Sequence, residues 1–330
     1  MKTGELGERG FLASISNYVN MVKGARLDFD EDASDFPISP DQSMVVNVDT
    51  FVRGTDWLPD MTAAQVGRKT AVMSLSDLAA KGAKPVSTML SLCVPDDYAA
   101  SEASELVRGF SQYGLKAGIP FIGGDMGMAS DVILTGIAMG VTSPDRIITR
   151  RGAKVGDIVA VTGKFGLTSV AYEILLRGKE AESNLQKDSL LAAYKPAINL
   201  ELVSALAARG AVTASMDSSD GLGITLHTIA GQSKVCFVMD ELPAARGVEA
   251  FARLHKMNEM KLVMQGGEEF LLVLTIPESK YDEADEVAKS LRVPLLKIGH
   301  VQKGTGVVYE SREGSVDVPS SGYDTFKEWA

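Results

Sequence analysis

TAAQVGRKTAVMSLSDLAAKGAK, residues 62–84, constrains the fold more than any other stretch of this chain. It is rich in alanine and free of proline, a composition that favours one long helix. Gly82, with Pro85 soon after it, predicts the end of that helix, because glycine commonly ends helices and proline cannot continue them. Ser76 and Asp77 lie inside the segment, either on a solvated face of the helix or in a polar site. Taken alone, the solvated face is the simpler interpretation.

The sequence around this segment alternates between strand and helix patterns. Residues 44–52 (MVVNVDTFV) and 86–95 (VSTMLSLCVP) are rich in β-branched residues and predict strands. Apolar spacing predicts one amphipathic helix over 101–118 and another helix over 11–24. The second half of the chain has the same texture. Several strands are connected too tightly for parallel crossovers, so the sequence predicts an α+β or mixed α/β fold and not a pure Rossmann domain.

A charged turn, RIITRRGAKVGD at residues 146–157, interrupts this alternation. Basic residues are concentrated where the regular pattern stops, which is typical of a junction between domains. With 330 residues, the chain is long enough for two ordinary domains. We therefore predict an N-terminal domain over residues 1–145 and a C-terminal domain over residues 146–330.

The net charge of −10 is spread along the chain and is not gathered in one tail. This balance argues against a general nucleic-acid-binding protein and against attachment to an anionic membrane, because both need clustered lysine and arginine. An anionic substrate is compatible with it, since bound Mg²⁺ can supply the missing positive charge.

The expected location is the cytoplasm. Cys93 and Cys236 lie far apart in apolar runs without metal-ligand spacing, so buried, reduced thiols are expected. The first residues, MKTGELGERG, contain no apolar signal segment. No stretch approaches the ~20 apolar residues that span a bilayer. We expect a soluble protein.

Acidic residues recur beside small residues at the polar ends of predicted strands and turns. They are Asp30-Glu31-Asp32, Asp49, Asp77, Asp125 in IGGD, and Asp217 with Asp220 in DSSDGLG. Small neighbours allow a triphosphate and its metal ions to approach the backbone. Carboxylate oxygens suit Mg²⁺, which bridges them to substrate phosphates. If these aspartates converge, they form a magnesium–phosphate site.

Each of these acidic residues also has a purely structural interpretation. Asp220 precedes the helix-like GLGITLHTIA, where a negative charge favours a helix N-terminus as readily as a metal. The GGD turn at 123–125, the GGEE turn at 266–269 and the acidic segment at 30–32, each taken alone, are more simply loops without a ligand. The chain has no GxxxxGK[ST] loop, and its histidines suggest no catalytic triad.

Taken in order along the chain, these segments resemble the thiamine-monophosphate kinase family. The matching segments are DEDA (30–33), NVDTFVRGTDW (47–57), VGRKTAVMSLSDLAAKGAKPV (66–86), IGGD (122–125), RRGAKVGD (150–157), DSSDGLG (217–223), GGEEF (266–270), IGHV (298–301) and SGYDTF (321–326). The resemblance spans nearly the whole chain, and SDLAAKGAKP is its most specific part. The superfamily also includes aminoimidazole ribonucleotide synthetase and selenophosphate synthetase.

The resemblance implies a two-domain, aminoimidazole ribonucleotide synthetase-like fold and a homodimer whose N-terminal sheets pair. The N-terminal domain would then bind ATP and Mg²⁺ and form the dimer, and the C-terminal domain would complete the active site. ATP is the implied co-substrate, with several Mg²⁺ ions. Its γ-phosphoryl group would pass to thiamine monophosphate and give thiamine diphosphate. Small molecules are the expected partners, with neither nucleic acid nor membrane.

The resemblance also assigns roles to individual residues. Metal-binding positions of the family fall on Asp32, Asn47, Val48 (through its backbone), Asp49, Asp77, Asp125, Asp217 and Asp220. Nucleotide-contacting positions fall on Gly124, Asp125, Arg150 and Ser219, and substrate-contacting positions fall on Asp56, Glu268 and Tyr323. Catalysis is expected to depend on Asp77, Asp125, Asp220 and Arg150.

The chain departs from the family pattern at three places. Glu31-Asp32 stands where many members have two aspartates. GTDW (54–57) stands where they have GVHF, so Asp56 replaces a histidine that meets the substrate. An aspartate can face the cationic thiazolium or the aminopyrimidine, but it cannot neutralise a phosphate. Val107 falls where the family has an aromatic residue near the adenine.

The expected mechanism needs no strong general base, because the acceptor is already an anionic phosphate. Positioning and charge neutralisation would promote the in-line transfer. A sibling ATP-dependent enzyme of the aminoimidazole ribonucleotide synthetase or selenophosphate synthetase type is the first alternative, although the chain shows neither a glycine-rich N-terminal signature nor an N-terminal reactive cysteine. A non-catalytic nucleotide-binding scaffold is the second, and the near-complete acidic set argues against it.

Overall fold

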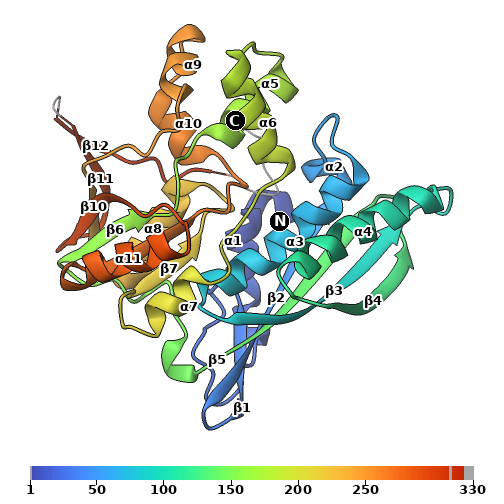
Figure 1. Cartoon of the computed structure of the whole chain (residues 1–330), viewed down its shortest axis with the longest axis horizontal. Helices are drawn as coiled ribbons and strands as arrows, with labels where there is room; N and C mark the ends of the chain where they lie inside the picture. The colour runs from blue at the N-terminus through green and yellow to red at the C-terminus, as the bar shows by residue number, and fades with distance from the viewer. Residues whose placement is uncertain (1, 312–313, 323–330) are drawn as a thin grey trace.

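The computed structural model of the protein describes residues 2–311 and 314–322. Their strands form two separate sheets (Figure 1). One is five-stranded, in the order β1-β2-β5-β3-β4, and the other is seven-stranded, in the order β12-β11-β8-β10-β6-β9-β7. Both sheets combine parallel and antiparallel pairs, which confirms the predicted mixed α/β fold.

The five-stranded sheet uses only the first half of the chain. Its strands are β1 (Ser34–Ser39), β2 (Gln42–Val52), β3 (Lys84–Val94), β4 (Phe121–Met128) and β5 (Ile133–Thr142). The strands predicted over 44–52 and 86–95 are confirmed as β2 and β3. Strands β3 and β4 are parallel and are connected by helix α4 (Ala100–Lys116), whereas the other pairs are antiparallel.

Helix α3 (Ala63–Ala80) is the long helix predicted from the alanine-rich segment. Thr62 caps its N-terminus, because its hydroxyl oxygen accepts a hydrogen bond from the N–H of Gln65 at 3.3 Å. The side chain of Gln65 in turn accepts from the N–H of Thr62 at 2.8 Å. The helix ends at Lys81, followed by Gly82 with a φ of 72°, as its sequence predicts.

Two glycines allow α3 and α4 to pack closely against each other. A Cβ atom added to Gly67 would lie 1.8 Å from the carbonyl oxygen of Leu106, and one added to Gly109 would lie 2.0 Å from that of Ala64. The paired helices cover one face of the five-stranded sheet (Figure 1). Side chains from that face, such as Leu134, complete a buried core with them.

The opposite face of the five-stranded sheet is left largely uncovered by the described residues. Buried and more exposed residues alternate along β2, β3 and β5, as expected when only one face packs against helices. Phe36, Val48 and Ile122 belong to the uncovered face and are 39%, 60% and 58% exposed. We call this the open face of the sheet.

The seven-stranded sheet is built from the second half of the chain and has helices on both sides. Its strands are β6 (Asp157–Val161), β7 (Ala214–Asp217), β8 (Cys236–Met239), β9 (Leu272–Pro277), β10 (Leu296–Gln302), β11 (Gly306–Ser311) and β12 (Gly314–Asp317). One hydrophobic core includes α5 (Leu167–Arg177), α6 (Ser183–Tyr194), α8 (Leu222–Ser233), α9 (Val248–Leu254) and α10 (Glu259–Gln265). A second core includes α7 (Leu202–Ala207) and α11 (Tyr281–Ser290).

The N-terminal helix α1 (Thr3–Ile15) corrects the prediction of a helix over 11–24. After Ile15 the chain continues only as a short 3₁₀ turn, Ser16–Tyr18. The side chains of Ser16 and Asn20 donate hydrogen bonds to nearby backbone carbonyls. Such local bonds compete with helix continuation, so the apolar spacing alone was misleading.

The predicted domain division at residue 145 lies between the last strand of the first sheet, which ends at Thr142, and the first strand of the second, which begins at Asp157. The position of the boundary itself stays a prediction. Within the described ranges, no helix has both the length and the apolar character that a membrane crossing demands. Cys93 and Cys236 are free thiols, and Cys236 is buried.

Candidate functional site

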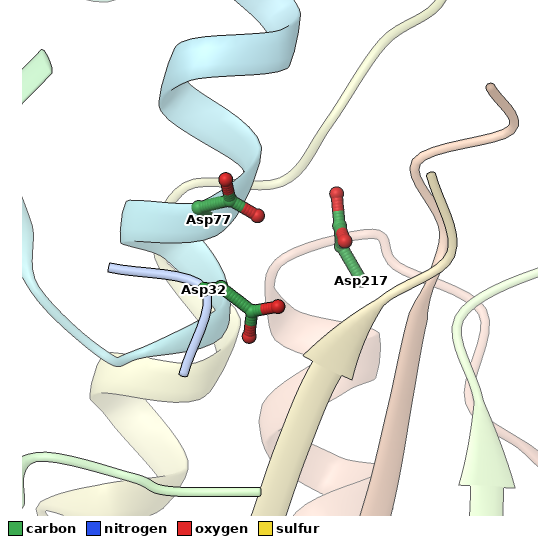
Figure 2. Close-up of side chains that lie close together, drawn as sticks. All are labelled: Asp32, Asp77 and Asp217. Atoms are coloured by element: carbon green, nitrogen blue, oxygen red, sulfur yellow. The ribbon is translucent and has the colours of Figure 1, made fainter. Parts of the chain in front are cut away.

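Three aspartates from distant parts of the sequence meet between the two sheets (Figure 2). Asp77 projects from α3, Asp32 from the loop before β1, and Asp217 from the end of β7. Each contributes a carboxylate oxygen, and these oxygens all lie within 4.8 Å of one another. Carboxylates this close repel one another unless a cation or a proton lies between them. The structure therefore brings together three of the residues singled out from the sequence.

Asp77 is oriented by a side chain from β2. The side-chain amide of Asn47 donates hydrogen bonds to the Asp77 carboxylate and, at 3.3 Å, to the backbone carbonyl of Ser74. Asp49, two residues further along β2, lies on the same face of the strand as Asn47. Strand β2 therefore presents its polar residues to the acidic side of α3.

The segment DSSDGLG joins β7 to α8, and its conformation decides between a helix cap and a site. The carboxylate of Asp217 accepts hydrogen bonds from the hydroxyls of Ser76 and, at 3.3 Å, of Ser219. The residue at the N-cap of α8 is Gly221, with a φ of 108°, and none of the described side chains caps this helix. The side chain of Asp220 instead lines the cleft described below.

Burial raises the pKa values of the carboxyl groups in this cluster. Removal from water, followed by the neighbouring charge of Asp217, raises the pKa of Asp49 to about 7. The same two causes hold the pKa of Asp77 well above its ordinary value. Burial also raises the pKa of Asp217, against the opposing hydrogen bond from Ser76. In the absence of a cation these carboxyl groups therefore keep their protons to a higher pH than free carboxyl groups do, and a cation would displace the protons.

Two basic residues neutralise the Asp32 side of the cluster. The Nζ atom of Lys81 lies 2.5 Å from Asp32 Oδ2 and 2.6 Å from Glu31 Oε2, and Lys81 is fully buried. The guanidinium of Arg150 pairs with Asp32, and its backbone N–H donates at 3.1 Å to both carboxylate oxygens of Glu31. Asp77, by contrast, accepts its hydrogen bond from a neutral amide. The fixed positive charge is thus concentrated on one side.

The cluster lies in the wall of a cleft with a volume of about 970 Å³. Predicted site residues that line the cleft are Asp32, Asn47, Val48, Asp49, Asp56, Asp77, Arg150, Ser219, Asp220 and Glu268. Helix α1 contributes Leu12 and Ala13 to another part of the lining. The cleft is large enough for an organic ligand of ordinary size, and its walls are unusually acidic.

Asp56 and Glu268 lie near each other in this wall. Asp56 ends the short helix α2 (Arg53–Asp56), and its Oδ2 atom accepts a hydrogen bond from the N–H of Val52 at 2.7 Å. Burial and, more weakly, the nearby Glu268 carboxylate raise the pKa of Asp56. Glu268 forms an ion pair of 2.5 Å with Lys69 and accepts a hydrogen bond from the hydroxyl of Tyr172.

Gly124 and Asp125 do not join the cluster within a single chain. In the register of the sheet, Asp125 is the neighbour of Ser91, Ser91 of Thr135, and Thr135 of Thr50 in β2. Three strand spacings, about 14 Å, therefore separate Asp125 from β2. The row places Asp125 on the open face, the face to which Thr50 of β2 also belongs.

A second, more apolar groove of about 820 Å³ lies between β4 and α4. Val107, the position aligned with the family aromatic, lines this groove together with Phe121 and Met126. Tyr323, the remaining predicted substrate contact, lies outside the described residues.

The sequence analysis missed the lysines of α3. Lys69, Met73, Asp77 and Lys81 recur at every fourth residue and therefore lie on one ridge of the helix. That spacing is a visible signal, although the sequence alone, which left a solvated face open for Ser76 and Asp77, assigned no role to the lysines. That interpretation is wrong, because Ser76 is 1% exposed and Asp77 lines the cleft.

Two protein-family models match the chain. They are described as AIR synthase related protein, N-terminal domain, over residues 30–142, and AIR synthase related protein, C-terminal domain, over residues 154–310. The thiamine-monophosphate kinase of Nitrosopumilus maritimus (strain SCM1) is 32% identical over 286 residues, which cover 87% of this chain and 90% of that relative.

Solved structures share the fold over nearly the full length. The crystal structure of tt0281 from Thermus thermophilus is 30% identical, with a TM-score of 0.84, and the match covers 93% of this chain and 97% of that one. The structure of AaThiL complexed with AMPPCP and TMP is 23% identical, also with a TM-score of 0.84, over 98% and 99% of the two chains.

Proposed function

Because the chain belongs to the thiamine-monophosphate kinase family, within the AIR synthase related proteins, we propose that it phosphorylates thiamine monophosphate with ATP and yields thiamine diphosphate. The two-domain fold of that family is the fold of this chain. The observation that carries the proposal is the convergence of Asp32, Asp77 and the buried Asp217 at the wall of a cleft that Asp32, Asp77 and Arg150 line. The proposed location is the cytoplasm, which supplies ATP and keeps free thiols reduced.

We propose Mg²⁺ as the cation of the cluster, with several ions bound in all. The donor atoms are carboxylate oxygens, which Mg²⁺ prefers, and the raised pKa values of Asp49 and Asp77 mark the charge that a cation would relieve. The proposed ligands are Asp32, Asn47, the backbone of Val48, Asp49, Asp77, Asp125, Asp217 and Asp220. When bound, Mg²⁺ supplies positive charge to the oxygens of the phosphoryl group in transit.

Arg150 is the proposed contact for the ATP phosphates. Its side chain is 17% exposed and is fixed by the ion pair with Asp32 and by a 2.6 Å hydrogen bond to the carbonyl of Asp30. A cation held in place before the reaction stabilises developing charge without the cost of reorganisation. Ser219 lines the same cleft and offers its hydroxyl to the nucleotide.

Asp56 and Glu268 are the proposed contacts for the acceptor. Two carboxylates cannot bind a phosphate, so they would face the cationic thiazolium and the aminopyrimidine of thiamine monophosphate. The acceptor phosphate would then point toward Arg150 and the aspartate cluster. Its own oxygen is the nucleophile, so this chain contributes alignment and charge neutralisation and does not need to remove a proton.

A homodimer is the proposed functional form, with the open faces of the two N-terminal sheets in contact. Exposed apolar residues such as Val48 and Ile122 favour a second layer on that face. Pairing would also bring Gly124 and Asp125 of one copy toward the cleft of the other. The adenine would lie in the apolar groove at Val107. Strand β4, which carries Gly124 and Asp125, forms part of the lining of this groove.

The proposed function is tested by incubating the protein with ATP, Mg²⁺ and thiamine monophosphate and measuring thiamine diphosphate by chromatography. Stoichiometric formation of ADP and thiamine diphosphate is expected. A parallel reaction with thiamine in place of its monophosphate should give no product, because the nucleophilic phosphate is missing. Release of ADP without thiamine diphosphate would assign the chain to another ATP-dependent reaction.

A further inference from the structure

The contacts of Glu268 point to a role for a residue that lies behind the cleft. We propose that Lys69 is a positioning residue for the acceptor, which acts by holding the Glu268 carboxylate in place at the wall of the cleft. This inference rests on the proposed function. It extends that function to Lys69, which is not among the predicted site residues.

Lys69 lies in the interior and forms an ion pair with Glu268 at the cleft. Its side chain is 0% exposed, whereas the side chain of Glu268 is 20% exposed and lines the cleft. The distance from Lys69 Nζ to Glu268 Oε1 is 2.5 Å, and the other oxygen, Oε2, accepts a hydrogen bond from Tyr172. Lys69 Nζ also lies 5.8 Å from the ring centre of Phe51, a face that suits a buried cation.

The backbone conformation of Glu268 and the contacts of its carboxylate together determine where the side chain points. Glu268 adopts a φ of 62°, in the left-handed region, and its N–H donates a 2.6 Å hydrogen bond to the carbonyl of Ser219. The Glu268 carboxylate lies near enough to Asp56 for the two negative charges to repel. Lys69 and Tyr172 contact both carboxylate oxygens of Glu268 and thereby fix the direction of its side chain.

A lysine that served only the fold would not need to pair with a carboxylate that lines the cleft. A buried ion pair adds little stability compared with apolar residues of the same size, because both charges must leave water. The geometry is better explained by the acceptor, because a cationic ring binds more tightly to a carboxylate that is already oriented. Lys69 would thus affect the affinity for thiamine monophosphate and leave ATP binding untouched.

The test compares steady-state kinetics of wild type with Lys69→Met, Tyr172→Phe, Glu268→Gln and the double variant Lys69→Met/Glu268→Gln. Lys69→Met should raise the KM for thiamine monophosphate roughly ten-fold or more, with kcat and the KM for ATP nearly unchanged. Tyr172→Phe, which preserves the shape of the ring, should raise the same KM by a smaller factor. The double variant should be no worse than Glu268→Gln, because Lys69 acts through Glu268.

Lys187→Met, at an exposed position of α6, is the matched control and should behave as wild type. An unchanged KM for thiamine monophosphate in folded Lys69→Met, equal rises in both KM values, or additive effects in the double variant would each overturn the inference. Protection against thermal unfolding by thiamine monophosphate, measured without ATP, keeps the test independent of turnover. If wild type binds the acceptor but forms no thiamine diphosphate, the proposed function fails, while loss of this protection in Lys69→Met still supports the role of Lys69.

Discussion

Asp77 combines a raised pKa, a neutral hydrogen-bond donor and two acidic neighbours, the combination expected of a residue whose charge serves a ligand more than the fold. Substitution of Asp77 is therefore expected to lower activity without lowering the stability of the fold. Asp77→Asn should lower kcat by about 100-fold or more, because a transition-state charge partner is lost. The thermal midpoint of the metal-free variant should equal or exceed that of wild type, because a repulsive charge has been removed.

Measurements of kcat and of the thermal midpoint are also made for Asp220→Asn, which changes a cleft residue from the second half of the chain. Loss of turnover with an intact thermal midpoint is again expected. Wild-type turnover in both variants would eliminate the proposed metal ligands, whereas unfolding of both would reassign the aspartates to the fold.

The raised pKa of Asp49 gives the protein a predictable response to pH. A folded-state pKa of about 7, above the ordinary value of 3.8, means that the folded state binds its proton more tightly than the unfolded state does. The contribution of this group to the free energy of unfolding therefore falls as pH rises from about 4 to about 7, and is constant above that. Mg²⁺ needs the ionised carboxylate, so stabilisation by Mg²⁺ should grow over the same interval.

This response is measured as the shift of thermal midpoint on adding Mg²⁺, from pH 5 to pH 8. Asp49→Asn should flatten part of the increase, with Asp77 and Asp217 providing the rest, since their pKa values are raised as well. A Mg²⁺-induced shift that is equal at all pH values would contradict the assignment of Asp49 to the metal site.

At the scale of elements, helix α3 connects the fold to the site. One side of it packs against α4 and the other carries the ridge of Lys69, Met73, Asp77 and Lys81. A small displacement of α3 would therefore disturb the core and three charged contacts together.

Gly109→Ala tests this coupling between packing and site. The added Cβ would meet the carbonyl oxygen of Ala64 at 2.0 Å, so α4 must shift away from α3. The expected loss in free energy of unfolding is about 1–3 kcal/mol, despite the better helix propensity of alanine. Gly231→Ala, in an exposed turn of α8 with no atom within 4 Å of the new Cβ, should instead stabilise the protein by about 0.5–1 kcal/mol. Urea denaturation measures the free energy of unfolding of both variants, which should change in opposite directions. Equal changes would show that the contact between α3 and α4 accommodates the added methyl group without cost.

Local sequence signals predicted the elements they control and failed where distant contacts decide. The capped, alanine-rich α3 and the β-branched β2 and β3 were predictable because their patterns are long and regular. The limits of α1 were not, since short side-chain bonds ended it early. In the site, the acidic residues were visible as motifs, but the partners of Lys69 and Lys81 were not, because ion pairs across the sequence leave no periodic trace.

At the scale of the whole molecule, the open face of the first sheet predicts the oligomeric state. Two chains of 35.1 kDa should sediment as one species of about twice that mass. Ile122→Asp places a charge at a site that is 58% exposed in the single chain and should yield monomers. The Ile122→Asp variant should lose activity as it loses the ability to dimerise, because Asp125 would no longer reach the cleft of a partner. A fully active wild-type monomer at micromolar concentration in analytical ultracentrifugation would refute the paired-sheet proposal.

The ridge of α3 also determines when this protein can finish folding during its synthesis. The ribosome completes α3 and the first sheet well before it makes Asp217, the partner of Ser76, or Glu268, the partner of Lys69. Until then Lys69 of the nascent N-terminal half lacks the carboxylate with which it pairs in the folded protein. We therefore expect the cleft to be completed only after residue 270 has been translated, because Ser219, Asp220, Glu268 and Phe270 all line it.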